Sequence, residues 1–248
     1  MSCEQCLQGT LHEGSPSGSI NTIAGVPVYT AIPKKQDYDR KKAVLYLGDI
    51  FGFYENPKLL CDAFADRLNV AIYFPDYLNN DAVPREEMNK GTFNLAKWRE
   101  THGSKETRAS LDPVIQELKS KHGVERFAAA GYCFGGKYVM ELCNENVIVA
   151  GMAAHPAGIQ VPQDLETFKS QSNTALLICA CETDQTWPKE SQDKAQEMLV
   201  SHGPGFKQVY YAGNKHGFAV RADISDPIQK QAKEDAFEQT VQWFSKYL

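Results

Sequence analysis

Short apolar runs and longer amphipathic runs alternate along most of the chain. Six apolar runs are bounded by charged or turn-forming residues, a pattern typical of strands buried on both faces. A seventh stretch, "INTIAGVPVYTAI", is interrupted by Gly25 and Pro27 and predicts two short strands. The six longer runs place strands within residues 42–52, 69–77, 125–133, 147–156, 174–184 and 206–217.

The amphipathic runs between these strands have helical spacing. They predict helices over residues 57–68, 85–100, 105–121, 134–144, 189–202 and 227–247. Strands that are apolar throughout and separated by helices indicate a mostly parallel sheet covered by helices on both faces. The fold class is therefore α/β, and functional loops are expected at the carboxyl ends of the strands. With 248 residues and no repeat or low-complexity linker, we expect one domain over residues 1–248.

Composition excludes several classes of partner. The formal net charge of −5 leaves no basic stripe to neutralise phosphates, so we expect no nucleic-acid partner. No signal peptide and no run of membrane-spanning length is visible, which predicts a cytoplasmic protein with no membrane partner. Seven scattered cysteines fit reduced thiols better than a disulfide framework.

Cys3 and Cys6 form one CxxC pair with His12 nearby. A structural zinc site normally needs a fourth ligand and a second close pair. We interpret this segment as a terminus without metal, and we expect no metal or cofactor elsewhere.

The segment "AAAGYCFGGKY" places Cys133 where a predicted strand meets a predicted helix. The pattern Gly131-x-Cys133-x-Gly135 is that of a nucleophile elbow, with cysteine in place of serine. Such an elbow needs small neighbours on both sides because the strand and the helix approach closely there. The alternative is a buried cysteine in a tight strand-to-helix turn that has no chemical role.

A thiol nucleophile needs a base and a group that orients the base. In the hydrolase order the acid comes next and the histidine last. Asp184 and His216 each follow a predicted strand, so the order Cys133, Asp184, His216 fits. The competing histidine is His155, which also lies at a strand end, and we rank it as a residue that lines the pocket.

An oxyanion hole needs two amide donors. One is the amide of Phe134, directly after the thiol, and the other is expected after an earlier strand, where "LGDIFG" places the amide of Ile50. Asp49 beside it has two possible uses. Its carboxylate could accept the thiol proton, or it could cap the helix that follows.

The segments "GYCFGGKY", "GDIFG", "ETDQTWP" and "KHGFAVRADIS" together resemble the dienelactone hydrolase family (carboxymethylenebutenolidase-like). The opening "MSCEQCLQGTLHEGSPSG" is similar to the fungal cytosolic branch of that family. The resemblance covers nearly the whole chain and implies an α/β-hydrolase fold, a metal-free esterase and an acyl-enzyme on cysteine.

Carried over by motif, Cys133 is the nucleophile, His216 the base and Asp184 its orienting acid. Bacterial members place a glutamate before "IFG" to take the thiol proton, whereas this chain has the shorter Asp49. Those enzymes hold a substrate carboxylate with two arginines. Arg221 matches one of them with one extra residue of spacing, and Arg85 and Arg99 are the candidates for the other.

The predicted substrate-binding residues include charged and aromatic side chains near these strand ends. They are Arg221, Trp98, Phe51, Trp187, His155 and Phe218. The leading hypothesis is a cysteine hydrolase of small carboxylic esters or lactones, acting as a monomer or a homodimer. Two alternatives stay open, namely a redox or stress protein that uses the Cys133 thiol and a ligand-binding protein on a hydrolase shell.

Overall fold

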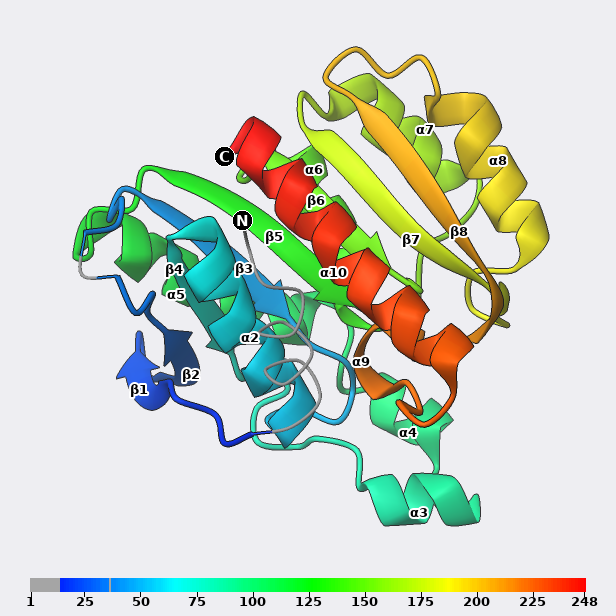
Figure 1. Cartoon of the computed structure of the whole chain (residues 1–248), viewed down its shortest axis with the longest axis horizontal. Coiled ribbons are helices and arrows are strands. Elements are labelled where there is room, and N and C mark those ends of the chain that lie inside the picture. The colour runs from blue at the N-terminus through cyan, green and yellow to red at the C-terminus, as the bar shows by residue number, and fades with distance from the viewer. Residues whose placement is uncertain (1–13, 36) are drawn as a thin grey trace.

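An eight-stranded sheet in the order β1-β2-β4-β3-β5-β6-β7-β8 forms the centre of the protein (Figure 1). The structure is a computed structural model that describes residues 14–35 and 37–248. The strands from β4 to β8 in that order pair in parallel, and the β1-β2 hairpin adds antiparallel strands at one edge. The strands are β1 (Ser19–Ile23), β2 (Val26–Ala31), β3 (Lys42–Leu47), β4 (Ala71–Pro75), β5 (Arg126–Tyr132), β6 (Ala150–Ala154), β7 (Ala175–Thr183) and β8 (Phe206–Lys215).

Helices cover both faces of this sheet. The helices of the described residues are α2 (Glu55–Leu68), α3 (Arg85–Lys90), α4 (Leu95–Arg99), α5 (Ser104–Ser120), α6 (Gly135–Asn144), α7 (Gln163–Gln171), α8 (Lys189–Leu199), α9 (Phe218–Arg221) and α10 (Pro227–Tyr247). In Figure 1, α2 (cyan) and α10 (red) lie on one face, while α5 and α6 lie on the other. The mostly parallel α/β architecture that the apolar runs predict is therefore confirmed.

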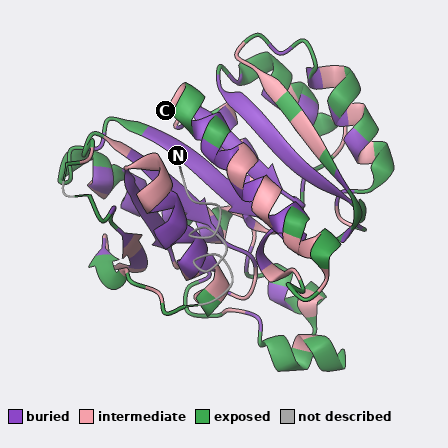
Figure 2. Ribbon diagram, viewed as in Figure 1, coloured by how far each residue is buried: buried purple, intermediate pink, exposed green. Residues whose placement is uncertain are grey.

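Alternate residues of each strand enter two separate hydrophobic clusters. In β3, Val44 and Tyr46 join the cluster under α2 and α10, while Leu45 and Leu47 join the cluster under α5 to α8. Figure 2 shows the resulting buried central sheet between helices whose outer faces are exposed. Because both faces are covered, the sequence of these strands is apolar throughout instead of alternating.

Three helical regions differ from the prediction, and one of them is the four-residue helix α9, which is too short to show a helical repeat in the sequence. The single helix expected over residues 85–100 is divided into α3 and α4, because Gly91 ends α3 in a left-handed conformation and the Asn94 side chain caps α4. The helix α7 was not predicted, since Leu165 and Phe168 are its only buried residues and give too weak an apolar pattern.

The described residues include neither a membrane-spanning helix nor a group of metal ligands. No described helix is long and apolar enough to cross a membrane. No group of three or more His, Cys, Asp and Glu side chains in residues 14–35 and 37–248 could hold a metal ion. Cys3, Cys6 and His12, the CxxC segment considered above, lie outside the described residues.

Candidate active site

Cys133 lies between β5 and α6, in a turn that only small neighbours permit. Its φ of 53° is in the left-handed region, which few residues other than glycine adopt. A Cβ atom on Gly131 would lie 2.6 Å from the carbonyl oxygen of Gly135, and one on Gly135 would lie 2.0 Å from that of Leu47. The two glycines of the pattern are therefore needed for the strand and the helix to approach each other.

We expect Gly135→Ala to lower the free energy of unfolding by about 3 kcal/mol or more, because the added methyl group meets backbone that cannot move aside easily. Urea unfolding measures this change. Gly203→Ala is the matched control, since a Cβ atom there has nothing within 4 Å, and its effect should be close to zero. Equal stability of the two variants would contradict this description of the turn.

Backbone hydrogen bonds fix the elbow to the loop that follows β6. The amide of Cys133 donates to the carbonyl oxygen of Ala154 at 3.1 Å, and its own carbonyl accepts from the amide of Ala157 at 2.9 Å. The carbonyl also accepts from the amide of Gly136 at 3.0 Å. The backbone of Cys133 is therefore held by the end of β6, by the loop that follows it and by the first turn of α6.

Asp184 and His216 meet beyond the ends of β7 and β8. Nδ1 of His216 lies 2.9 Å from Oδ2 of Asp184. The other carboxylate oxygen, Oδ1, accepts from the amides of Thr186 at 2.8 Å and Trp187 at 3.1 Å. Burial tends to raise the pKa of Asp184, but hydrogen bonds from His216 and Thr186 hold it below its usual value. The residue therefore stays an anion that can orient the imidazole.

The imidazole of His216 favours its protonated form. Burial alone would lower its pKa, but the hydrogen bond with Asp184 and the interaction with the Cys133 thiol raise it to about 9. Because Nδ1 faces Asp184, the other ring nitrogen, Nε2, is the one that can serve the thiol. The three residues predicted from their strand ends are thus brought together.

The two predicted oxyanion amides follow the ends of two strands that pair with each other, β3 and β5. Residues Leu47 and Gly131 are directly paired in the register of β3 and β5, so the loops that carry Ile50 and Cys133 leave the sheet side by side. Within the described residues, the amides of Ile50 and Phe134 have no hydrogen-bond acceptor. Both N–H groups therefore lack a protein acceptor, which an oxyanion hole requires of its donors.

Asp49 is held by three donors from its own loop and from α9. Its Oδ1 accepts from the amide of Phe51 at 3.0 Å, and its Oδ2 accepts from the Tyr54 hydroxyl at 2.8 Å and from Arg221. The N-cap of α2 is Tyr54, with no side-chain cap hydrogen bond, so Asp49 does not cap that helix. Its carboxylate is occupied by Arg221 in this conformation.

Two arginines flank Phe51 in the loop after β3. The guanidinium of Arg221 lies 5.1 Å from the centre of the Phe51 ring, and that of Arg85 lies 5.4 Å from it and 4.5 Å from the Tyr54 ring. Burial alone would lower the pKa of Arg221, but the Asp49 carboxylate raises it, so the guanidinium stays charged. Of the two candidates for a second arginine, Arg85 is the one that stacks on this loop.

Four predicted substrate-binding residues have little or no exposed surface. Trp98 is 6% exposed, Phe218 is 2% exposed, and Trp187 and His155 are fully buried. Their side chains are packed among neighbouring residues in this conformation, and their role in binding substrate stays a prediction.

The imidazole of His155 packs against the imidazole of His216. The two ring centroids are 4.8 Å apart in an edge-to-face arrangement. Burial, followed by repulsion from His216 and Arg221, holds the pKa of His155 well below its ordinary value. Neither ring nitrogen has a hydrogen-bond partner among the described residues. His155 is therefore a neutral packing neighbour of His216.

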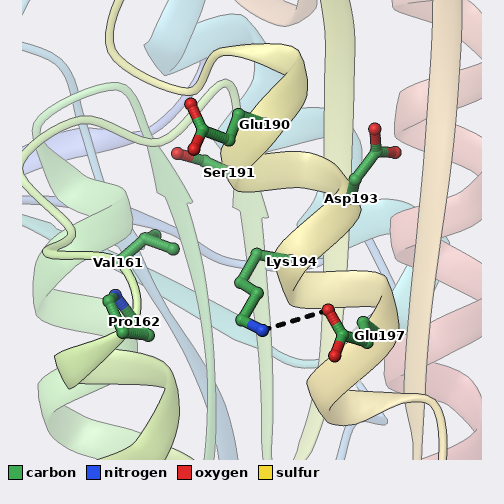
Figure 3. A pocket seen from close by; sticks show the side chains of 7 residues that line it. All are labelled: Val161, Pro162, Glu190, Ser191, Asp193, Lys194 and Glu197. Atoms are coloured by element: carbon green, nitrogen blue, oxygen red, sulfur yellow. Dashed lines mark hydrogen bonds and ion pairs between the residues drawn. The ribbon is translucent and has the colours of Figure 1, made fainter.

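A separate surface cavity of about 770 Å³ lies between the start of α7 and α8 (Figure 3). Its charged lining comprises Glu190, Asp193, Glu197 and Lys194, and Lys194 is paired with Glu197 at 3.0 Å. Figure 3 shows no thiol and no imidazole in this lining. The cavity therefore does not share the chemistry of the cluster around Cys133.

A mostly parallel sheet, with the candidate residues in loops after its carboxyl ends, defines the α/β-hydrolase fold. The model of the dienelactone hydrolase family matches residues 26–248, so the chain belongs to that family. This makes it a hydrolase of esters or lactones and confirms the resemblance found in the sequence.

Curated fungal relatives align over almost their full length. The hydrolase tropI from Talaromyces stipitatus is 33% identical over 98% of this chain and 95% of its own length. The hydrolase pyvD from Aspergillus violaceofuscus is 31% identical over 98% of this chain and 96% of its own length. A dienelactone hydrolase-like promiscuous phosphotriesterase from metagenomic libraries shares the fold, with a TM-score of 0.70, 16% identity and coverage of 94% of this chain and 99% of its own.

Proposed function

We propose that this protein hydrolyses small carboxylic esters or lactones through an acyl-enzyme on Cys133. The observation that carries the proposal is the elbow thiol of Cys133, which interacts with the His216 imidazole, while the buried Asp184 carboxylate lies 2.9 Å from Nδ1 of that imidazole. A nucleophile, a base and an orienting acid in this arrangement suit acyl transfer.

In the proposed first step, the Cys133 thiolate attacks the ester carbonyl carbon and forms a C–S bond. The electron pair of the carbonyl moves to its oxygen, where the amides of Ile50 and Phe134 stabilise the negative charge. When the tetrahedral intermediate collapses, the C–O bond to the leaving group breaks. Protonated His216 gives its Nε2 proton to that leaving oxygen. In a lactone, the leaving oxygen remains attached to the acyl chain.

In the second step, water attacks the thioester carbonyl. Neutral His216 takes a proton from this water, and the C–S bond then breaks to release the carboxylic acid. The thiolate and the imidazolium are restored together, so protons balance over the cycle. Asp184 keeps the same tautomer of His216 in both steps by accepting from Nδ1.

The pairing of Asp49 with Arg221 supports a substrate that carries a carboxylate. A substrate carboxylate that binds the Arg221 guanidinium would compete directly with Asp49. In any fraction of the enzyme whose thiol is still protonated, the released Asp49 carboxylate would then offer a second proton acceptor. Arg85, stacked on Phe51 and Tyr54, places a second positive charge near the same loop. Within the ester and lactone class, we therefore favour anionic lactones of the dienelactone type.

The proposal is tested by assaying the purified protein with p-nitrophenyl acetate and with a dienelactone, before and after treatment with iodoacetamide. We expect both substrates to be hydrolysed and both activities to disappear in proportion to alkylation of Cys133. A higher kcat/KM for the dienelactone would support the carboxylate site. Absence of hydrolysis together with rapid consumption of peroxide would contradict the proposal and favour a redox role for the thiol.

The raised pKa of His216 predicts the alkaline side of the pH profile. The imidazolium is present below its pKa of about 9 and is lost as the pH rises through that value, so kcat/KM should fall there. Asp184→Asn removes the carboxylate that raises this pKa, and the alkaline limb should move to lower pH. Rate measurements from pH 6 to about pH 10 test both statements. An alkaline limb at the same pH in both proteins would contradict them.

A further inference from the structure

The side chain of Thr186 lies at the junction of three loops that carry the candidate site. Its Oγ1 is 2.8 Å from Oδ1 of Asp184, 3.2 Å from Nδ1 of His216 and 3.1 Å from the carbonyl oxygen of Pro156. These partners follow β7, β8 and β6 respectively. Sequence patterns gave no signal for this residue, because two of the three partners are 30 positions away.

A hydroxyl has one proton and two acceptor lone pairs, which limits how these contacts can be made. Nδ1 of His216 carries a proton both in the imidazolium and in the neutral tautomer that faces Asp184. That N–H can donate to the Thr186 hydroxyl as well as to the Asp184 carboxylate. The hydroxyl proton then points to the carboxylate of Asp184 or to the carbonyl of Pro156. In either case the negative end of the O–H dipole faces the imidazole, which stabilises its positive charge.

The Pro156 contact links this arrangement to the nucleophile. Pro156 lies in the loop that brackets Cys133, because Ala154 and Ala157 on either side of it hydrogen-bond to the Cys133 backbone. Thr186 therefore connects the loop that holds the acid with the loop that holds the elbow. The backbone amides of Thr186 and Trp187 fix Asp184 independently of the hydroxyl.

We propose that the Thr186 hydroxyl is a positioning group for His216, one that keeps the imidazole aligned between Asp184 and Cys133 and favours its protonated form. The expected effect of Thr186 on the rate rests on the proposed function, whereas its expected effect on the His216 imidazole does not. The titratable groups next to His216 are Asp184 after β7, Cys133 after β5 and His155 after β6, and Arg221 in α9 interacts with His155 and Cys133. Thr186 contacts one of these four directly, the Asp184 carboxylate.

Thr186→Val removes the hydroxyl and keeps the branched shape of the side chain, whereas Thr186→Ser keeps the hydroxyl. We expect Thr186→Val to lower kcat/KM about tenfold or more, the scale of one hydrogen bond to a charged group. The alkaline limb of its pH profile should move to lower pH, and Thr186→Ser should restore both quantities. Thr167→Val is the matched control, since the Thr167 hydroxyl bonds only within its own helix, to the carbonyl of Gln163.

The second readout is the pKa of His216 measured by NMR titration of its imidazole in the wild type and in Thr186→Val. A lower pKa in the variant is expected, and this measurement needs no substrate. Unchanged kcat/KM and an unchanged pKa in Thr186→Val would overturn the inference, as would equal losses in Thr186→Val and Thr186→Ser. A wild type that hydrolyses no ester would overturn the proposed function instead, while the NMR result would still decide the role of Thr186.

Discussion

Replacing Cys133 with alanine should lower kcat/KM for an activated ester by at least about a thousandfold, because no other group can form the acyl intermediate. The loss should fall on kcat as well as on kcat/KM, since the covalent step itself disappears. Cys133→Ala changes little in packing, because alanine also fits between Gly131 and Gly135. Circular dichroism and urea unfolding check that the variant is folded.

Cys143→Ala is the control for the loss of a buried thiol. Cys143 lies in α6, and burial raises the pKa of its thiol to about 12, so it is not a nucleophile at neutral pH. We expect this variant to keep wild-type kcat/KM. Retained hydrolysis in Cys133→Ala would refute the acyl-enzyme mechanism.

Removal of the imidazole should have an effect of similar size. We expect His216→Ala to lower kcat/KM by about a thousandfold, because it removes the proton donor for the leaving group and the base for water. The Cys133 thiol should also react more slowly with iodoacetamide at neutral pH, since the imidazolium no longer favours the thiolate. The alkylation rate is measured by mass spectrometry and does not depend on any substrate.

His122→Ala is the matched histidine control for that experiment. His122 is exposed and lies outside the cluster around Cys133, so both hydrolysis and alkylation should stay at wild-type rates. If alkylation of Cys133 were equally fast in His216→Ala and in the wild type, the imidazole would not activate the thiol. That result would leave Asp49 as the remaining candidate for this step.

The features that the sequence predicts well are those that one short segment contains. The buried parallel strands are continuous apolar runs, and the elbow is a local pattern of glycines around Cys133. Asp184 and His216 could be placed because each follows its own strand, and the carboxyl ends of parallel strands meet at one edge. These local signals lead to the correct fold and to the residues that the structure brings together.

The features that sequence missed depend on contacts between distant segments. Asp49 and Arg221 are 172 positions apart, so nothing near either residue indicates that they form an ion pair. Thr186 acquires its role from loops after three different strands. His155 and Trp187 are fully buried, which their residue types alone do not indicate. Only the three-dimensional structure shows these contacts, because they join segments that are distant in the sequence.

The most direct test of the proposed mechanism is to look for the acyl-enzyme itself. The protein is mixed with p-nitrophenyl acetate, quenched in acid during turnover, digested with trypsin and analysed by mass spectrometry. We expect an acetyl group on the peptide of residues 127–137, whose single cysteine is Cys133. Hydrolysis without any acylated peptide, or with the acyl group on another residue, would contradict the mechanism.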